Sequence, residues 1–140
     1  MDQKVLEILG GLFREYTGHE AELSEVLPHS GSYREYVRLR RENFSAIGTY
    51  NADIKENRAF ISFSRHFRES GIPVPEILLQ DEDPRYYLQE DLGSVTLFDF
   101  LNKTRIHEGF SRTIIDEYKK VLSILPSIQV TAGKTIDYSV

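Results

Sequence analysis

The sequence predicts an α+β fold in which an antiparallel sheet of about five strands carries one packed helix. Three patterns support this prediction. Residues 2–16 and 53–70 have apolar side chains at helical spacing. Short runs bounded by turn-forming residues lie between and after them, which is typical of strands. Beyond residue 92 only helical patterns remain, so we divide the chain into residues 1–92 and residues 93–140.

An amphipathic helix is predicted at the N-terminus, over residues 2–16. Its apolar face consists of Val5, Leu9, Leu12 and Tyr16. Three strands are predicted next, over residues 22–27, 33–40 and 44–50. In the second of these strands Val37 and Leu39 point to one side and Arg38 to the other, because side chains alternate along a strand.

The second helix is predicted over residues 53–70. Asp53 and Glu56 form a capping-box pattern at its start, and Gly71 is a natural residue to end it. Phe60, Phe63 and Phe67 are spaced as an aromatic stripe along it. The remaining predicted elements are two strands, 76–80 and 86–90, and two helices, 96–102 and 112–125, followed by a weakly patterned tail.

Composition excludes several classes of function. The chain has 140 residues and a net charge of -5, and this acidity argues against a binder of nucleic-acid phosphates. The absence of cysteine excludes disulfide scaffolds, thiolate metal sites and cysteine nucleophiles. No apolar run approaches the roughly 18–20 residues of a membrane span. Asp2 and Glu7 also interrupt any leader peptide, so we expect no membrane contact and a cytoplasmic location.

Histidines and carboxylates give weak signals. The four histidines are scattered and none is spaced as a metal-binding pair, which disfavours a zinc site. Glu90 and Asp91 lie where the last predicted strand gives way to helix. They are interpreted either as a catalytic pair or as a solvated turn in which Asp91 accepts from nearby backbone N–H groups; the turn is favoured.

The segment that joins the first two predicted strands carries the sharper signal. Ser30, Gly31 and Ser32 form a small-residue loop whose backbone N–H groups would suit a phosphate. Taken alone, the loop is better explained as an ordinary hairpin turn. Arg34 and Arg38 follow on one strand face, and guanidinium groups bind phosphate oxygens well. The alternative is a solvated face on which these arginines pair with acids such as Glu35 or Glu42.

Taken together, four segments resemble the N-terminal lobe of the aminoglycoside phosphotransferase and choline kinase-like family. They are LPHSGSYREYVRL (27–39), NADIKENRAF (51–60), GIPVPEIL (71–78) and YLQEDLG (87–93). Within this family the sequence is most similar to bacterial kinases of N-acetylmuramate and N-acetylglucosamine. The resemblance covers residues 23 to 128 or so and implies a protein-kinase-like fold, with the nucleotide held between a sheet-rich lobe and a helical lobe.

The resemblance also implies roles for individual residues. Ser30, Gly31 and Ser32 would cover the phosphates of ATP. Ile47 would form part of the apolar ceiling above the base. Glu90 and Leu92 would offer backbone groups to the adenine edge at the hinge. The cofactors implied are ATP and Mg²⁺, and the acceptor implied is a hydroxyl of a sugar or amino sugar.

Two departures from the family pattern matter. The third predicted strand, 44–50, lacks the lysine that family members use to hold the ATP phosphates. Our hypothesis is that Arg34 or Arg38 supplies this charge and that Glu56 orients it. The family's catalytic and metal-binding motifs of the second lobe are also absent from the sequence. We therefore expect an inactive fragment of an ATP-dependent phosphotransferase that contains only the beginning of the second lobe.

A second hypothesis assigns the chain to a different class of function. A lobe without the strand lysine fits a non-catalytic binding or regulatory module, which keeps partner contacts but has lost nucleotide chemistry. In either case the face that would meet a second lobe is expected to be exposed, and self-association through this face is expected.

Overall fold

The computed structural model describes residues 1–28 and 31–139, which form an α+β structure built on a five-stranded antiparallel sheet. The order of the strands across the sheet is β1-β2-β3-β5-β4. The strands are β1 (Leu23–Val26), β2 (Glu35–Arg41), β3 (Phe44–Tyr50), β4 (Ile77–Gln80) and β5 (Tyr86–Glu90). The α-helices are α1 (Gln3–Thr17), α2 (Ile54–Glu69), α3 (Leu97–Glu108) and α4 (Arg112–Pro126). The predicted fold class and sheet are thus confirmed.

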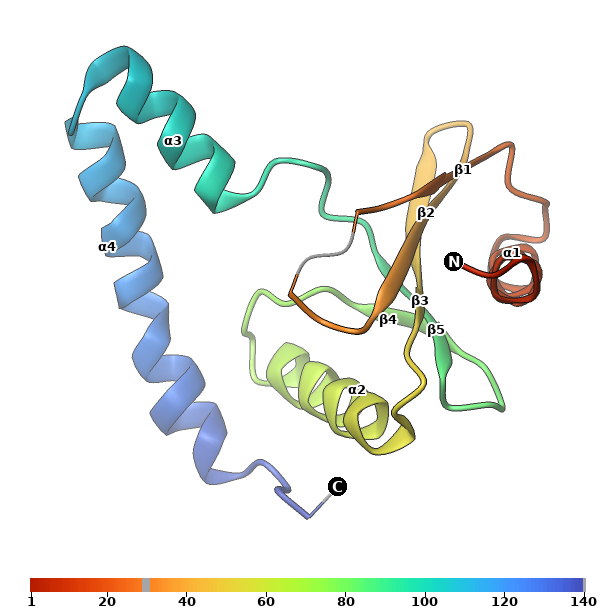
Figure 1. The fold of residues 1–140 in the computed structure, drawn as a ribbon. Coiled ribbons are helices and arrows are strands. Elements are labelled where there is room, and N and C mark those ends of the chain that lie inside the picture. Colours follow the sequence, from red (N-terminus) through yellow and green to blue (C-terminus); the bar gives the residue numbers. More distant parts are fainter. Residues whose placement is uncertain (29–30, 140) are drawn as a thin grey trace.

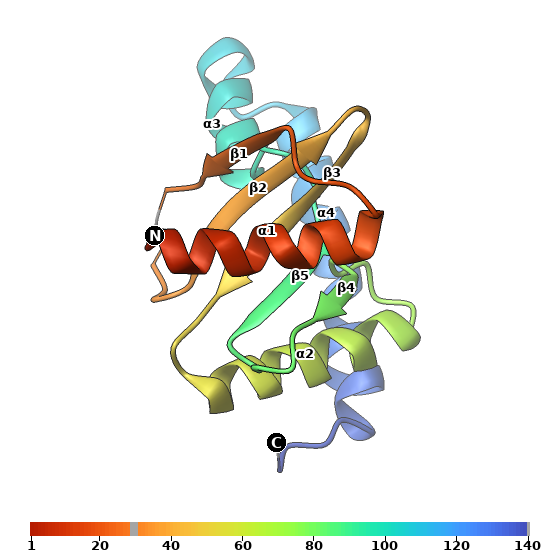
Figure 2. The ribbon, with the colours of Figure 1, turned by 90° about the vertical axis from the view of Figure 1, so that its right-hand side faces the viewer.

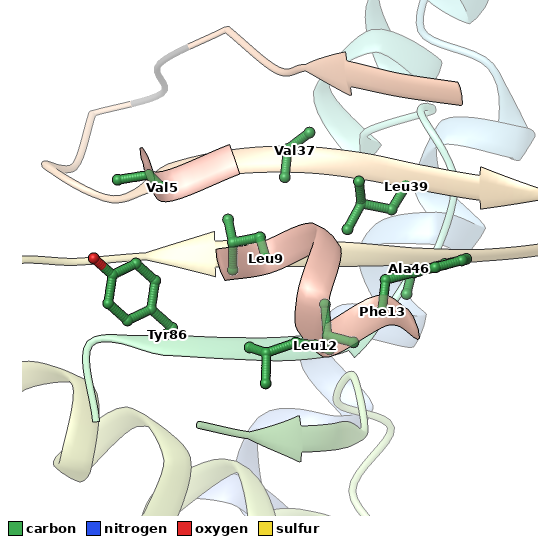
Figure 3. Close-up of a cluster of buried hydrophobic side chains, with 9 residues drawn as sticks. Val5, Leu9, Leu12, Phe13, Val37, Leu39, Ala46 and Tyr86 are labelled. Atoms are coloured by element: carbon green, nitrogen blue, oxygen red, sulfur yellow. The ribbon is translucent and has the colours of Figure 1, made fainter. Parts of the chain in front are cut away.

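Helix α1 lies across one face of the sheet, and α2 packs on the other side (Figures 1 and 2). The core between α1 and the sheet consists of Val5, Leu9, Leu12, Phe13, Val37, Leu39, Ala46, Tyr86 and Leu88 (Figure 3). Gly48 makes this close packing possible. A Cβ atom there would lie 3.0 Å from Val37 Cγ1 and 3.2 Å from Leu9 Cβ, so a side chain would push α1 away.

Helix α2 combines a side-chain cap at its start with polar and apolar contacts to the rest of the chain. Asp53 caps its N-terminus by accepting a hydrogen bond of 3.0 Å from the Glu56 N–H, as predicted. The fully buried Asn57 amide donates to the carbonyls of Pro84 and Arg85, at 3.1 Å each. Phe60, Phe63 and Phe67 are only half-buried, so the expected aromatic stripe is not the main anchor of this helix.

The C-terminal helices extend away from the sheet (Figure 1). Helix α3 continues to Glu108, beyond the predicted end at residue 102, and Thr96 caps its start by accepting from the Asp99 N–H at 3.1 Å. After α4 the chain forms a π-helical turn, Ser127–Thr131, and a 3₁₀ turn, Ala132–Lys134. Here it returns to α2, where His66 Nε2 lies 2.8 Å from the Ala132 carbonyl oxygen.

Many apolar side chains of the C-terminal helices are exposed. The most exposed ones in this region are Val95, Phe98, Ile106, Phe110, Leu122 and Tyr138. None of the helices in the described ranges, 1–28 and 31–139, has the length and apolarity needed to cross a membrane.

Candidate functional site

The face of the sheet opposite α1 carries two cross-strand rows of side chains. Arg38, Ile47 and Gln89 are register partners across β2, β3 and β5, and Tyr36, Thr49 and Tyr87 form the next row. Directly paired residues point to the same face of a sheet. This face is therefore polar, in contrast to the apolar face under α1.

Arg34 and Glu56 form an ion pair at the edge of this face. Arg34 Nη2 lies 2.9 Å from Glu56 Oε1, and its guanidinium carbon lies 4.5 Å from the centre of the Phe60 ring. Asn51 Nδ2 donates to the other Glu56 oxygen at 3.0 Å. The Arg34 side chain is only 11% exposed, so a positive charge is held in place by α2.

Several polar atoms of this face and of the ion pair at its edge are buried without a hydrogen-bond partner in the described part of the chain. They are Arg34 Nε, Thr49 Oγ1, Tyr87 OH and Gln89 Oε1. Burial raises the pKa of the Tyr87 phenol, although the positive charge of Arg34 opposes this shift, so the hydroxyl stays protonated at neutral pH. Buried groups of this kind normally find a partner, in protein, water or ligand.

Arg38 makes a different arrangement, which ties β2 to the segment that follows β5. Its Nε donates to Asp91 Oδ2 at 2.8 Å, and its Nη2 donates to Asp91 Oδ1 at 3.2 Å and to the Gly93 carbonyl at 3.1 Å. The weaker contact of Nη1 with Glu25 is 3.4 Å long. Only 5% of the Arg38 side chain and 4% of the Asp91 side chain are exposed.

This ion pair changes the titration of both groups. Burial raises the pKa of the Asp91 carboxyl, but the hydrogen bonds from Arg38 and the Gly93 N–H outweigh it and leave the pKa below the ordinary range. The hydrogen bond to Asp91 raises the pKa of Arg38, against the effect of burial. Both groups are therefore charged at neutral pH and neutralise each other.

The predicted phosphate loop is described only in part. Ser30 lies outside the described residues. Gly31 is exposed and has a φ of 64°, a left-handed conformation that favours glycine. Ser32 Oγ accepts a hydrogen bond of 3.2 Å from the Arg34 N–H. The structure thus joins Ser32, Arg34 and Glu56 in one group of residues.

The remaining predicted residues lie on β3 and around the hinge. Ile47 is 6% exposed on the polar face. The Glu90 N–H donates to the Glu76 carbonyl at 2.8 Å. Of the two backbone groups of Glu90, only the carbonyl could therefore form a hydrogen bond with the edge of a nucleotide base. Its carboxylate lies 3.3 Å from Arg68, and Leu92 is 66% exposed.

The acids that pair with Arg34 and Arg38 are not Glu35 and Glu42, which the alternative prediction named. Glu35 instead contacts the N-terminal amine of Met1 at 2.9 Å. Glu42 lies in the turn between β2 and β3, with a φ of 52°, and its N–H donates to Glu22. Asp91 does accept from the Gly93 N–H at 2.9 Å, as the turn interpretation predicted, but it is buried rather than solvated.

Sequence reasoning missed Tyr87 and Phe60 as members of the site. Thr49 and Tyr87 are register partners on β3 and β5, so their side chains lie together in one cross-strand row. The sequence predicts Phe60 only as part of an aromatic stripe, whereas in the structure its ring contacts Arg34 and lies 5.8 Å from the Tyr87 ring. Only the knowledge of which strands pair could have revealed this grouping.

Within the described ranges, no three histidine, aspartate or glutamate side chains gather as a metal site would require. Comparison with models of known protein families gives no match for this chain. A search among curated proteins gives none either.

Proposed function

We propose that this chain is the nucleotide-binding lobe of an ATP-dependent phosphotransferase. The parent enzyme would transfer the γ-phosphate of ATP to a hydroxyl of a sugar or amino sugar. One observation carries the proposal beyond the resemblance: Arg34 is held by Glu56 while its Nε has no partner among the described residues. A buried, oriented donor of this kind suits a phosphate oxygen.

The residues have distinct parts in this proposal. Arg34 replaces the missing strand lysine, and Glu56 orients it. Arg38 is not a phosphate ligand, because its donors are committed to Asp91, Gly93 and Glu25. Gly31 and Ser32 lie beside the phosphates with Ser30, and Ile47 contacts the base. Leu92 N–H and the Glu90 carbonyl meet the adenine edge.

The chemistry needs groups beyond this chain. Mg²⁺ would neutralise charge on the transferred phosphate, and its ligands and the base that deprotonates the acceptor hydroxyl belong to the second lobe in our proposal. The chain alone is accordingly proposed to bind nucleotide without turnover.

Replacing Arg34 with alanine is expected to weaken the binding of Mg-ATP about tenfold or more, since one charge-assisted hydrogen bond is lost. Isothermal titration calorimetry of the chain with Mg-ATP measures this effect. Arg40→Ala is the matched control, because Arg40 is exposed on β2, the strand that follows Arg34, and makes no ion pair within the described residues. Arg34→Lys is expected to retain part of the affinity.

Two results contradict the proposal. One is equal affinity of the wild-type chain and Arg34→Ala for Mg-ATP, and the other is no saturable binding by the wild-type chain. The second result would favour the non-catalytic module, for which the exposed apolar side chains of α3 and α4 offer a contact surface.

A further inference from the structure

A cavity lies along α2, away from the Arg34 site. Its volume is about 870 Å³, within the range of small-molecule sites. Besides α2, it is bounded by β4 and the C-terminal tail. The lining residues are Lys55, Arg58, Ile61, Ser62, Arg65, His66, Glu69, Gln80 and Ser139.

Helix geometry separates this cavity from the proposed nucleotide site. Successive residues of an α-helix are rotated by about 100° around its axis. Arg58 and Arg65 therefore lie on the side of α2 opposite Phe60 and Glu56, which face Arg34. A ligand in the cavity and a ligand at Arg34 would be on different sides of one helix.

Several positively charged side chains line the cavity, and they have no ion-pair partner among the described residues. Lys55, Arg58 and Arg65 make no ion pair within the described residues, and Glu69 is the one acid among the described lining residues. Most other arginines are ion-paired in the structure, namely Arg14, Arg34, Arg38, Arg41, Arg68, Arg85 and Arg112. The described lining residues thus carry an excess of positive charge, although the net charge of the chain is -5.

The spacing of these charges gives a physical reason for binding. Lys55 and Arg58 are three residues apart on one helix face, where like charges destabilise a helix. A bound anion would relieve this repulsion. Ile61 adds a buried apolar contact, with 2% of it exposed, and Gln80 adds a polar contact from β4.

We propose that this cavity binds a small organic anion with at least two negative charges, carried by phosphate or carboxylate groups. Arg58 and Arg65 are its main ligands, and Lys55 adds a third positive charge. This site is separate from the proposed nucleotide site, because the recorded side-chain partners of Arg34 and Glu56 are each other, Asn51 and Phe60, and neither Asn51 nor Phe60 lines the cavity.

Titration of the chain with pyrophosphate and, separately, with citrate tests the proposal. Calorimetry at low salt is suitable, because binding to exposed cations weakens as salt is added. The variant Arg58→Gln/Arg65→Gln is expected to weaken the binding at least about tenfold. Arg105→Gln is the matched control, since Arg105 is an exposed arginine of α3 without an ion pair in the described residues. Circular dichroism verifies that each variant is folded.

The two probes distinguish the chemistry of the ligand. If pyrophosphate alone binds and the double variant weakens this binding, the site is assigned to phosphates. If citrate binds and the double variant weakens that binding, the site is assigned to carboxylates. The proposal is overturned if neither probe saturates, or if Arg105→Gln loses as much affinity as the double variant. Loss of pyrophosphate binding in Arg34→Ala but not in the double variant also overturns it, since the anion would then bind at the nucleotide site.

Discussion

Replacement of Arg38 with alanine is expected to lower the free energy of unfolding by about 3 to 5 kcal/mol, the usual cost of breaking a buried ion pair. The Asp91 carboxylate would remain buried, with 4% of its side chain exposed, and would lose its bidentate partner. The Gly93 carbonyl would lose a donor as well. Urea denaturation followed by circular dichroism measures the difference.

A pair of comparison variants isolates the effect of burial. Arg112 also faces an acid, Asp116, but its side chain is 92% exposed, so Arg112→Ala is expected to cost at most about 1 kcal/mol. The double variant Arg38→Met/Asp91→Leu removes both charges and is expected to be more stable than Arg38→Ala alone. Equal stability of Arg38→Ala and Arg112→Ala would show that the buried ion pair does not stabilise the fold.

The same ion pair predicts a dependence of stability on pH. The pKa of Asp91 is lower in the folded chain than its ordinary value, so the folded state favours the charged carboxylate. This contribution is complete above the unfolded pKa of about 3.9 and is lost as the pH falls through the folded pKa. Wild type should therefore lose more stability than the Met/Leu double variant on acidification below pH 4 or so.

Replacement of Leu9 with alanine is expected to cost about 2 to 5 kcal/mol of stability. Leu9 is fully buried between α1 and the sheet, and Gly48 leaves no side chain that could fill the resulting space. A cavity would therefore remain under α1. Urea denaturation, with the same probe as above, measures the loss.

Leu122→Ala serves as the matched control for Leu9. It removes the same atoms from a side chain of α4 that is 63% exposed, so a change below about 0.5 kcal/mol is expected. If both leucine variants had similar stabilities, α1 would not be an integral part of the core.

The fold could be predicted from sequence largely because its periodic segments are unambiguous. Strands β3 and β5 and helix α4 begin where the patterns placed them, and Asp53 caps α2 as its capping box predicted. Helix α3 was predicted too short, because Ile106 is the single apolar side chain in residues 103–108 and this segment shows no apolar face. Backbone hydrogen bonds and the Thr96 cap extend a helix without such a face.

The candidate site was predictable only in part. The hypothesis from the sequence was that Glu56 orients either Arg34 or Arg38, and the structure places Glu56 2.9 Å from Arg34. The partner of Arg38 was missed because Asp91 lies far from it in the sequence. The cations of the cavity along α2 give no motif either, since the cavity forms only where β4 and the tail meet this helix.

The contact between Arg38 and Asp91 also bears on how the chain folds. It joins residues 53 positions apart, so it requires the sheet to be assembled up to the end of β5. Closing a long loop costs conformational entropy before the contact stabilises the chain. We expect this contact to form late, after the rate-limiting step. We therefore expect the loss of Arg38 to appear chiefly as faster unfolding, with a refolding rate close to that of the wild-type chain. This ion pair would then set the lifetime of the folded state more than the speed of its formation.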